Sequence, residues 1–177
     1  MLNRQATGDR PIAQDAYLNQ SSDCLGSLRL HSDSLPLALT KKKGAYKMQY
    51  TLFTDGSCLK NPGGAGGYAA ILLPDMSQAV GGDRSTTNNR MEMKAIIEGL
   101  KMLPPKSNVL VVSDSQLAIN CAARKWKRKK NLDLWSEYDE ASAGHDIDFE
   151  WVPGHSGHEW NEECDRLAGE AANRYAR

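Results

Sequence analysis

The stretch QYTLFTDGS, residues 49–57, combines strand-forming residues with an acid and a glycine near its end. Because aromatic and β-branched residues favour strands, we expect a strand over residues 49–55 that ends on Asp55. The stretch VLVVSDS, residues 109–115, repeats this design and carries Asp114 after its apolar run. If the two strands lie side by side, the two carboxylates converge. Like charges held together repel, so we expect a cation between them.

The composition is typical of one compact domain with a tail. The 177 residues are 40% hydrophobic and 25% charged, which is enough apolar material for one core. The cysteines are widely separated and form no CxxC pair, which argues against a zinc site and a disulfide framework. No stretch approaches the roughly 18 apolar residues of a membrane span, and no signal-peptide pattern opens the chain. We therefore expect a soluble, cytoplasmic monomer that does not bind membranes.

Residues 1–47 differ from the rest of the chain. They are rich in serine, carry scattered leucines without a sustained period, and close with KKKG at residues 41–44. We interpret them as a disordered tail before a domain at residues 48–177. One alternative is a mitochondrial transit peptide, against which three aspartates count because such peptides avoid acids. The other is a start-site artefact, with translation beginning at Met48.

Apolar periodicity predicts a mixed α/β domain. Strands are expected at residues 49–55, 68–73, 77–82, 108–113 and 147–152, with a glycine-rich turn at 61–67. Helices are expected at residues 88–102, from 115, at 132–142 and at 160–175. Three strands joined by short turns, then strands separated by helices, predict an antiparallel meander beside parallel strands in one sheet.

The glycine-rich stretch GGAGGYA, residues 63–69, superficially fits a dinucleotide-binding signature after a strand. That signature must open a helix, whereas residues 68–73 predict another strand, so we interpret the stretch as a bent hairpin. The sequence also has no GxxxxGK[ST] loop, so it does not support a nucleotide-triphosphate site.

Two further acids lie beside the apolar faces of expected helices. Glu92 is in the first turn of one helix, and Asp165 is near the start of the last helix. Either acid alone is explained by a favourable interaction with the helix dipole. Taken with Asp55 and Asp114, their shared placement indicates a hard-metal site of carboxylates. The last helix is expected to bury one face, made of Cys164, Leu167, Ala168, Ala171, Ala172 and Tyr175.

The loop VPGHSGHEWN, residues 152–161, contains two histidines. No thiolates stand at the spacing that zinc sites use, so a general acid/base or a group facing phosphate is the better interpretation for at least one of them. His158 is also compatible with a purely structural role.

The segment RKWKRKK, residues 124–130, places six cations around one tryptophan. The chain has zero net charge and residues 48–177 are mildly acidic, so this basic segment is a local feature. A solvated surface usually mixes both signs of charge. We interpret the basic segment as an anion-binding feature, with a solvated helix end as the alternative.

Five motifs, in order and spacing, resemble type 1 ribonuclease H of the bacterial kind over about residues 48–175. They are FTDGSC with NPG, TTNNRME, SDSQ, GHSGH and NEECD, which begin at residues 53, 61, 86, 113, 154 and 161. The resemblance implies the ribonuclease H-like fold, a five-stranded mixed sheet flanked by helices. It further implies sequence-independent endonucleolytic hydrolysis of the RNA strand in RNA·DNA hybrids, giving 5′-phosphate and 3′-hydroxyl products. Two Mg²⁺ ions are the implied cofactors, with Mn²⁺ as an alternative.

The resemblance also assigns roles to individual residues. It implies metal-binding carboxylates at Asp55, Glu92, Asp114 and Asp165, with Asp55 bridging the ions, and His155 as an assisting catalytic residue. Minor-groove and 2′-hydroxyl contacts are implied for Cys58, Asn61, Asn88, Asn89 and Gln116, and a DNA-phosphate contact for Thr87.

The basic segment departs from the family pattern. Well-known bacterial members carry a longer basic insertion with several tryptophans, whereas here residues 124–130 run almost directly into the next helix. We still assign hybrid binding to its last four cations, which are Lys127, Arg128, Lys129 and Lys130.

Two other classes of function remain as alternatives. One is a polynucleotidyl transferase or resolvase with the same fold, against which the hybrid-specific pattern at Asn88, Asn89 and Gln116 counts. The other is a non-catalytic hybrid-binding module, against which the four intact carboxylates count.

Overall fold

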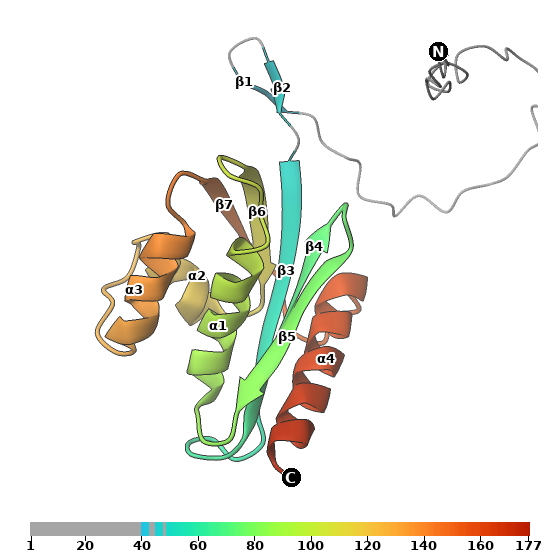
Figure 1. The fold of residues 1–177 in the computed structure, drawn as a ribbon, viewed down its shortest axis with the longest axis vertical. Coiled ribbons are helices and arrows are strands. Elements are labelled where there is room, and N and C mark those ends of the chain that lie inside the picture. Colours follow the sequence, from blue (N-terminus) through green and yellow to red (C-terminus); the bar gives the residue numbers. More distant parts are fainter. Residues whose placement is uncertain (1–39, 43–44, 48) are drawn as a thin grey trace, which may run out of the picture. The chain divides into compact units, whose positions relative to one another are not determined.

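A five-stranded mixed sheet with helices on both faces forms the main body of the chain (Figure 1). The computed structural model describes residues 40–42, 45–47 and 49–177. The sheet contains β3 (Gln49–Cys58), β4 (Gly66–Leu73), β5 (Ser77–Asp83), β6 (Asn108–Ser113) and β7 (Asp146–Trp151). The helices are α1 (Asn88–Leu100), α2 (Gln116–Ala122), α3 (Leu132–Ala141) and α4 (Glu159–Tyr175).

Two short strands precede this body. β1 (Thr40–Lys42) and β2 (Ala45–Lys47) pair antiparallel in a sheet of their own, which the sequence did not indicate. The rest of the expected tail, residues 1–39 with 43–44, lies outside the described residues. The interpretation of residues 1–47 as a disordered tail or a start-site artefact therefore stays a prediction.

The strand order of the sheet is β5-β4-β3-β6-β7. β3 pairs antiparallel with β4, and β4 with β5, which gives the expected meander. β3 pairs parallel with β6, and β6 with β7. The predicted fold class is confirmed, and β3 stands at the centre of the sheet.

The two faces of the sheet bury different helices. Side chains alternate along a strand, so Leu52 and Phe53, both fully buried on β3, point to opposite faces. Leu52 belongs to a core formed with α1, α2 and α3. Phe53 belongs to a second core, which Cys164 and Ala168 of α4 complete. Figure 1 shows α4 alone on its side of the sheet, opposite α1.

Two glycines allow helices to approach the sheet closely. A Cβ atom on Gly56 would lie 2.2 Å from the main-chain nitrogen of Glu92, so α1 could not pack against β3 there with any other residue. A Cβ atom on Gly67 would lie 2.3 Å from the carbonyl oxygen of Ala168 on α4. The first approach brings Glu92 beside the residue that precedes Gly56, which is Asp55.

Two details differ from the sequence expectations. β3 continues to Cys58 because its pairing with β4 continues to that residue, so Asp55 lies within the strand rather than at its end. Tyr175 was expected on the buried face of α4 but is 38% exposed, because it is the last residue of the helix. Among the described residues, no helix has both the length and the apolar character needed to span a membrane.

Candidate active site

Three carboxylates from three different elements meet at the centre of the sheet. One carboxylate oxygen each of Asp55, Glu92 and Asp114 lies within 4.8 Å of the others. Asp55 comes from β3 and Glu92 from α1, while Asp114 follows β6. The parallel register of β3 and β6 pairs Thr54 with Ser113, which sets the two aspartates at the same level of neighbouring strands. The convergence of these aspartates expected from the sequence is therefore observed.

Burial makes this carboxylate cluster electrostatically unfavourable when it is empty. Asp55 is 5% exposed and Glu92 is 8% exposed. Burial raises the pKa of Asp55 to about 7, and repulsion from Asp114 adds to the rise. Burial and then repulsion from Asp55 raise the pKa of Glu92 well above its usual value. A positive charge among these groups would remove both penalties.

One buried carboxylate oxygen of the cluster has no hydrogen-bond partner among the described residues. The Gly56 amide donates to Oδ1 of Asp55 at 2.6 Å, and Nδ2 of Asn88 donates to Oε1 of Glu92 at 3.0 Å. Oε2 of Glu92 is buried and has no hydrogen-bond partner among the described residues. A buried acceptor without a donor is costly, and hard divalent cations are bound by carboxylate oxygens. The donor set therefore fits a divalent metal ion.

Asp114 is held by residues that the sequence did not single out. Nε1 of Trp151, at the end of β7, donates to the main-chain oxygen of Asp114 at 2.9 Å. A Cβ atom on Gly154 would lie 2.7 Å from Oδ2 of the same aspartate. The turn after β7 therefore packs directly on this carboxylate. Partial burial raises the pKa of Asp114 as well.

A second group of side chains adjoins the carboxylate cluster. Nδ1 of His155 lies 3.6 Å from Oδ2 of Asp165 and 3.9 Å from Oε2 of Glu162. This group is more open to solvent, since the His155 side chain is 80% exposed and that of Asp165 is 44% exposed. Repulsion from Asp165 contributes to the raised pKa of Asp55, so the two groups adjoin. The structure thus brings together all four predicted metal-binding carboxylates and His155.

Glu162 is the member of this second group that sequence reasoning missed. Its Oε1 accepts a hydrogen bond from the Gly157 amide at 3.1 Å, which ties the histidine loop to α4. Residues three apart share a helix face, so the spacing of Glu162 and Asp165 was the available signal. The sequence did not show that the loop would fold back onto that face.

Some of the predicted substrate-binding residues form hydrogen bonds within the protein, and others are exposed to solvent. Oγ1 of Thr87 caps α1 by accepting from the Arg90 amide at 3.4 Å. Oδ1 of Asn61 accepts from the Asn88 amide at 3.2 Å, and the Asn88 side chain continues to Glu92. The thiol of Cys58 donates to the Lys60 carbonyl oxygen at 3.4 Å.

Asn89 and Gln116 are exposed at the starts of α1 and α2. Asn89 also lines a pocket of about 230 Å³ beside the basic segment. Three cations of the basic segment that are exposed to solvent line the same pocket, and they are Lys127, Lys129 and Lys130. Arg128 also lines the pocket, but it differs from the lysines because its side chain is only 13% exposed and contacts protein groups.

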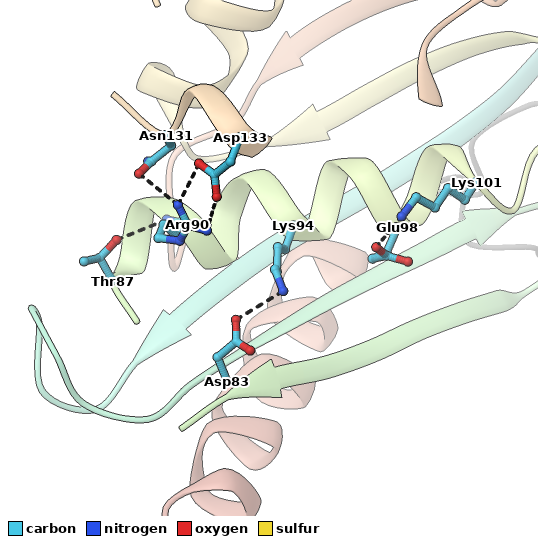
Figure 2. A network of polar contacts seen from close by, with 8 residues as sticks. All are labelled: Asp83, Thr87, Arg90, Lys94, Glu98, Lys101, Asn131 and Asp133. Carbon is cyan, nitrogen blue, oxygen red and sulfur yellow. Dashed lines mark hydrogen bonds and ion pairs between the residues drawn. The ribbon is translucent and has the colours of Figure 1, made fainter. Parts of the chain in front are cut away.

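A network of ion pairs fixes the helices next to this pocket (Figure 2). Arg90 of α1 forms two hydrogen bonds to the carboxylate of Asp133 at 3.1 and 2.6 Å, and a third to Oδ1 of Asn131 at 3.3 Å. The guanidinium holds the pKa of Asp133 at about 2. Lys94 of the same helix pairs with Asp83 of β5 at 3.1 Å.

Comparison with known proteins agrees with this arrangement. The family described as RNase H matches residues 47–173. The chain is 47% identical over 138 residues to a protein from Sulfurovum named ribonuclease H, covering 72% of this chain and 93% of that protein. It is 48% identical over 127 residues to ribonuclease HI of Helicobacter pylori, covering 66% of this chain and 88% of that protein.

A solved structure supports the same relationship. The N-terminal RNase H domain of a Mycobacterium tuberculosis protein superposes with a TM-score of 0.63 at 27% identity, covering 72% of this chain and 96% of that one. A mixed sheet with acids clustered at its centre, together with these relatives, defines a nuclease of the ribonuclease H-like fold. The chain belongs to the RNase H family, with bacterial type 1 relatives, and is a ribonuclease H enzyme.

Proposed function

We propose that this enzyme is an endonuclease that hydrolyses the RNA strand of RNA·DNA hybrids without sequence preference. The proposed products carry 5′-phosphate and 3′-hydroxyl ends, and the proposed cofactors are two Mg²⁺ ions. The observation that carries the proposal is the cluster of Asp55, Glu92 and Asp114, whose oxygens lie within 4.8 Å of one another. The names of the bacterial relatives support the reaction class.

The proposed ion ligands are the carboxylates of Asp55, Glu92, Asp114 and Asp165. Divalent ions bound there would supply Lewis-acid activation of water and stabilisation of the leaving 3′ oxygen. The chain itself contributes a rigid arrangement of acids. Gly56 permits the close packing of α1 on β3 that sets Glu92 beside Asp55, and Trp151 at the end of β7 donates to the main chain of Asp114.

His155 is proposed to move a proton during the reaction. Its side chain is 80% exposed beside Asp165, at the border between the carboxylate cluster and solvent. A group in this position can exchange protons with water while it lies next to the reacting phosphate. Glu162 and the Gly157 amide keep the loop in place through their 3.1 Å hydrogen bond.

Selection of a hybrid is proposed to depend on the starts of α1 and α2. Asn61, Asn88 and Glu92 form a continuous series of hydrogen bonds at 3.2 and 3.0 Å from the loop after β3 to the carboxylate cluster. A sugar 2′-hydroxyl that contacts these amides would report RNA on the strand nearest the carboxylates. Recognition of sugars and phosphates, without base edges, explains cleavage that is independent of sequence.

The test uses a duplex whose RNA strand is labelled at its 5′ end, with Mg²⁺ or with EDTA. We expect cleavage of the RNA strand in the hybrid with Mg²⁺, and no cleavage of it with EDTA. Double-stranded DNA, double-stranded RNA and single-stranded RNA are the controls and should stay intact. Cleavage of double-stranded DNA at a similar rate would favour a resolvase, and binding of the hybrid without cleavage would favour a non-catalytic module.

A further inference from the structure

Arg128 points into the protein, unlike the lysines on either side of it. Nη1 lies 2.8 Å from Oδ1 of Asp139 on α3, and Nε donates to the carbonyl oxygen of Cys121 on α2 at 3.1 Å. The guanidinium carbon lies 4.3 Å from the ring centroid of Trp135 and 5.2 Å from that of Tyr138. One side chain of the basic segment therefore joins α2 to α3.

The chemistry of these contacts suits arginine specifically. The carbonyl of Cys121 is at the C-terminal end of α2, where helix carbonyls lack partners within the helix and attract positive charge. A planar guanidinium can stack on an aromatic face while its edges donate hydrogen bonds, which a lysine ammonium cannot reproduce. Nη2 is buried with no hydrogen-bond partner among the described residues, and the whole side chain is only 13% exposed.

Both ends of the basic segment are also fixed. Arg124 and Asn131 have left-handed backbones with φ of 56° and 54°, and they begin and end the excursion between α2 and α3. The amides of Lys125 and Trp126 donate to the Asn120 carbonyl oxygen at 2.9 and 3.0 Å. At the other end, Asn131 is bonded to Arg90 (Figure 2). Arg128 lies between these two ends, in the part of the segment that carries the lysines.

We propose that Arg128 is a positioning residue, which anchors the basic segment so that Lys127, Lys129 and Lys130 face the substrate. The three lysines line the 230 Å³ pocket together with Asn89 and with Ser115, the N-cap residue of α2. Arg128 lines this pocket too, but its guanidinium is held by Asp139 and by the Cys121 carbonyl oxygen. The guanidinium of Arg128 contacts protein groups, and Arg128 affects hybrid binding by holding the three lysines in position. The part of this inference that concerns hybrid binding rests on the proposed function. The anchoring of the basic segment by Arg128 is independent of it.

The experiment compares Arg128→Lys, which keeps the charge, with Arg128→Gln, which removes it. The matched control is Lys129→Gln, an exposed neighbour. Amide hydrogen exchange of peptides covering residues 124–131 measures anchoring, and hybrid binding in Ca²⁺ measures its consequence. In both Arg128 variants we expect exchange about tenfold faster or more, and hybrid affinity lower by on the order of tenfold. Lys129→Gln should leave exchange within about twofold of the wild type.

A smaller intervention checks the same contact from the other side. Asp139→Asn weakens the pairs of Asp139 with both Arg128 and Arg124, which lies 3.4 Å away with a 75% exposed side chain. It should still accelerate exchange in residues 124–131 less than either Arg128 variant does, because the stacking and the Cys121 bond remain. Circular dichroism melting shows whether each variant is folded. Arg128→Lys is the mildest of the Arg128 changes and keeps the comparison informative if Arg128→Gln unfolds.

The outcomes separate anchoring from direct charge contact. Wild-type exchange and affinity in Arg128→Lys, with loss only in Arg128→Gln, would overturn the proposal, because charge alone would then suffice. Faster exchange in Arg128→Lys with unchanged affinity would also overturn it, since the anchor would not control binding. Failure of the wild-type enzyme to cleave a hybrid would contradict the proposed function instead, and the exchange measurement would still decide the anchoring.

Discussion

The carboxylate cluster and the basic segment are built in opposite ways. Each acid of the cluster comes from, or directly follows, a regular element, and Asp55 and Glu92 are almost fully buried between β3 and α1. The basic segment has no helix or strand over residues 124–131, and its lysines are exposed. Core packing positions the groups assigned to the chemistry, whereas a few specific contacts position those assigned to binding. Changes in the two regions should therefore affect different measurements.

The largest effect is expected at the centre of the carboxylate cluster. Asp55→Asn should reduce hydrolysis of a hybrid by roughly 1000-fold or more, because a lost metal ligand costs several kcal/mol of transition-state stabilisation. In metal-free buffer its melting temperature should rise, since one repelling charge has been removed. Activity assays and thermal melts measure the two effects. Asp148→Asn, an exposed acid on β7, is the control. Loss of cooperative unfolding in Asp55→Asn would show that Asp55 is structural.

The pH dependence of stability measures the combined cost of burying Asp55 and of its repulsion by Asp114, without a substitution. The folded pKa of Asp55 is about 7, above its ordinary value of 3.8, so the folded state binds the proton more tightly. In metal-free buffer the free energy of unfolding should increase as pH falls from 8 to 5, by roughly 2–3 kcal/mol from Asp55 alone.

Denaturant melts across this pH range test the prediction. The pKa of Asp133 is held at about 2, so this acid stabilises the fold above about pH 4 and loses the effect only at lower pH. Its contribution is therefore constant between pH 8 and 5 and does not affect the measurement. Asp55→Asn should flatten the increase, and the pH dependence that remains is due to Glu92 and Asp114, whose pKa values are also raised. An identical pH dependence in the variant and the wild type would mean that Asp55 is not the group that titrates.

Substitution of His155, the exposed neighbour of the carboxylate cluster, should reduce activity less than substitution of the buried carboxylates. His155→Ala should lower kcat by about 10- to 100-fold, because the step that it serves can be served in part by water. Steady-state kinetics on a labelled hybrid give the value, and His145→Ala, in the turn between α3 and β7, is the control. A loss equal to that of Asp55→Asn would assign His155 a role in metal binding.

The smallest effect on chemistry is expected in the basic segment. Replacing Lys127, Lys129 and Lys130 by glutamine should raise KM by on the order of tenfold with kcat nearly unchanged. The slope of log affinity against log salt should decrease by roughly 0.9 for each phosphate group that the variant no longer binds. Hybrid binding titrated across salt in Ca²⁺ provides this slope.

Lys101→Gln, beyond the far end of α1, is the matched control for removing a surface charge. An unchanged slope in the triple variant would mean that the basic segment is a solvated surface that does not bind phosphate. A fall in kcat alone would mean that the segment positions the carboxylate cluster, and the difference between the two regions would disappear.

The sequence by itself predicted the elements and the acids. The strands and the helix that carry Asp55, Asp114 and Glu92 are determined largely by residues close together in the chain. Apolar periodicity and capping residues are therefore sufficient to locate these elements. The division of the sheet into an antiparallel meander and parallel strands also followed from short turns and intervening helices, whereas the strand order came from the structure. The prediction that β3 ends at Asp55 was wrong because a strand continues as far as its partner does, and β4 pairs with it to Cys58.

Only the tertiary structure decided which partners each side chain has. The contacts of Trp151 with Asp114, of Glu162 with the His155 loop and of Arg128 with α2 and α3 join segments whose approach is set by packing. The same holds for the unpartnered oxygen of Glu92. A sequence shows which residues carry charge, but burial and the distance to other charges determine whether that charge faces a substrate, a metal ion or the protein itself.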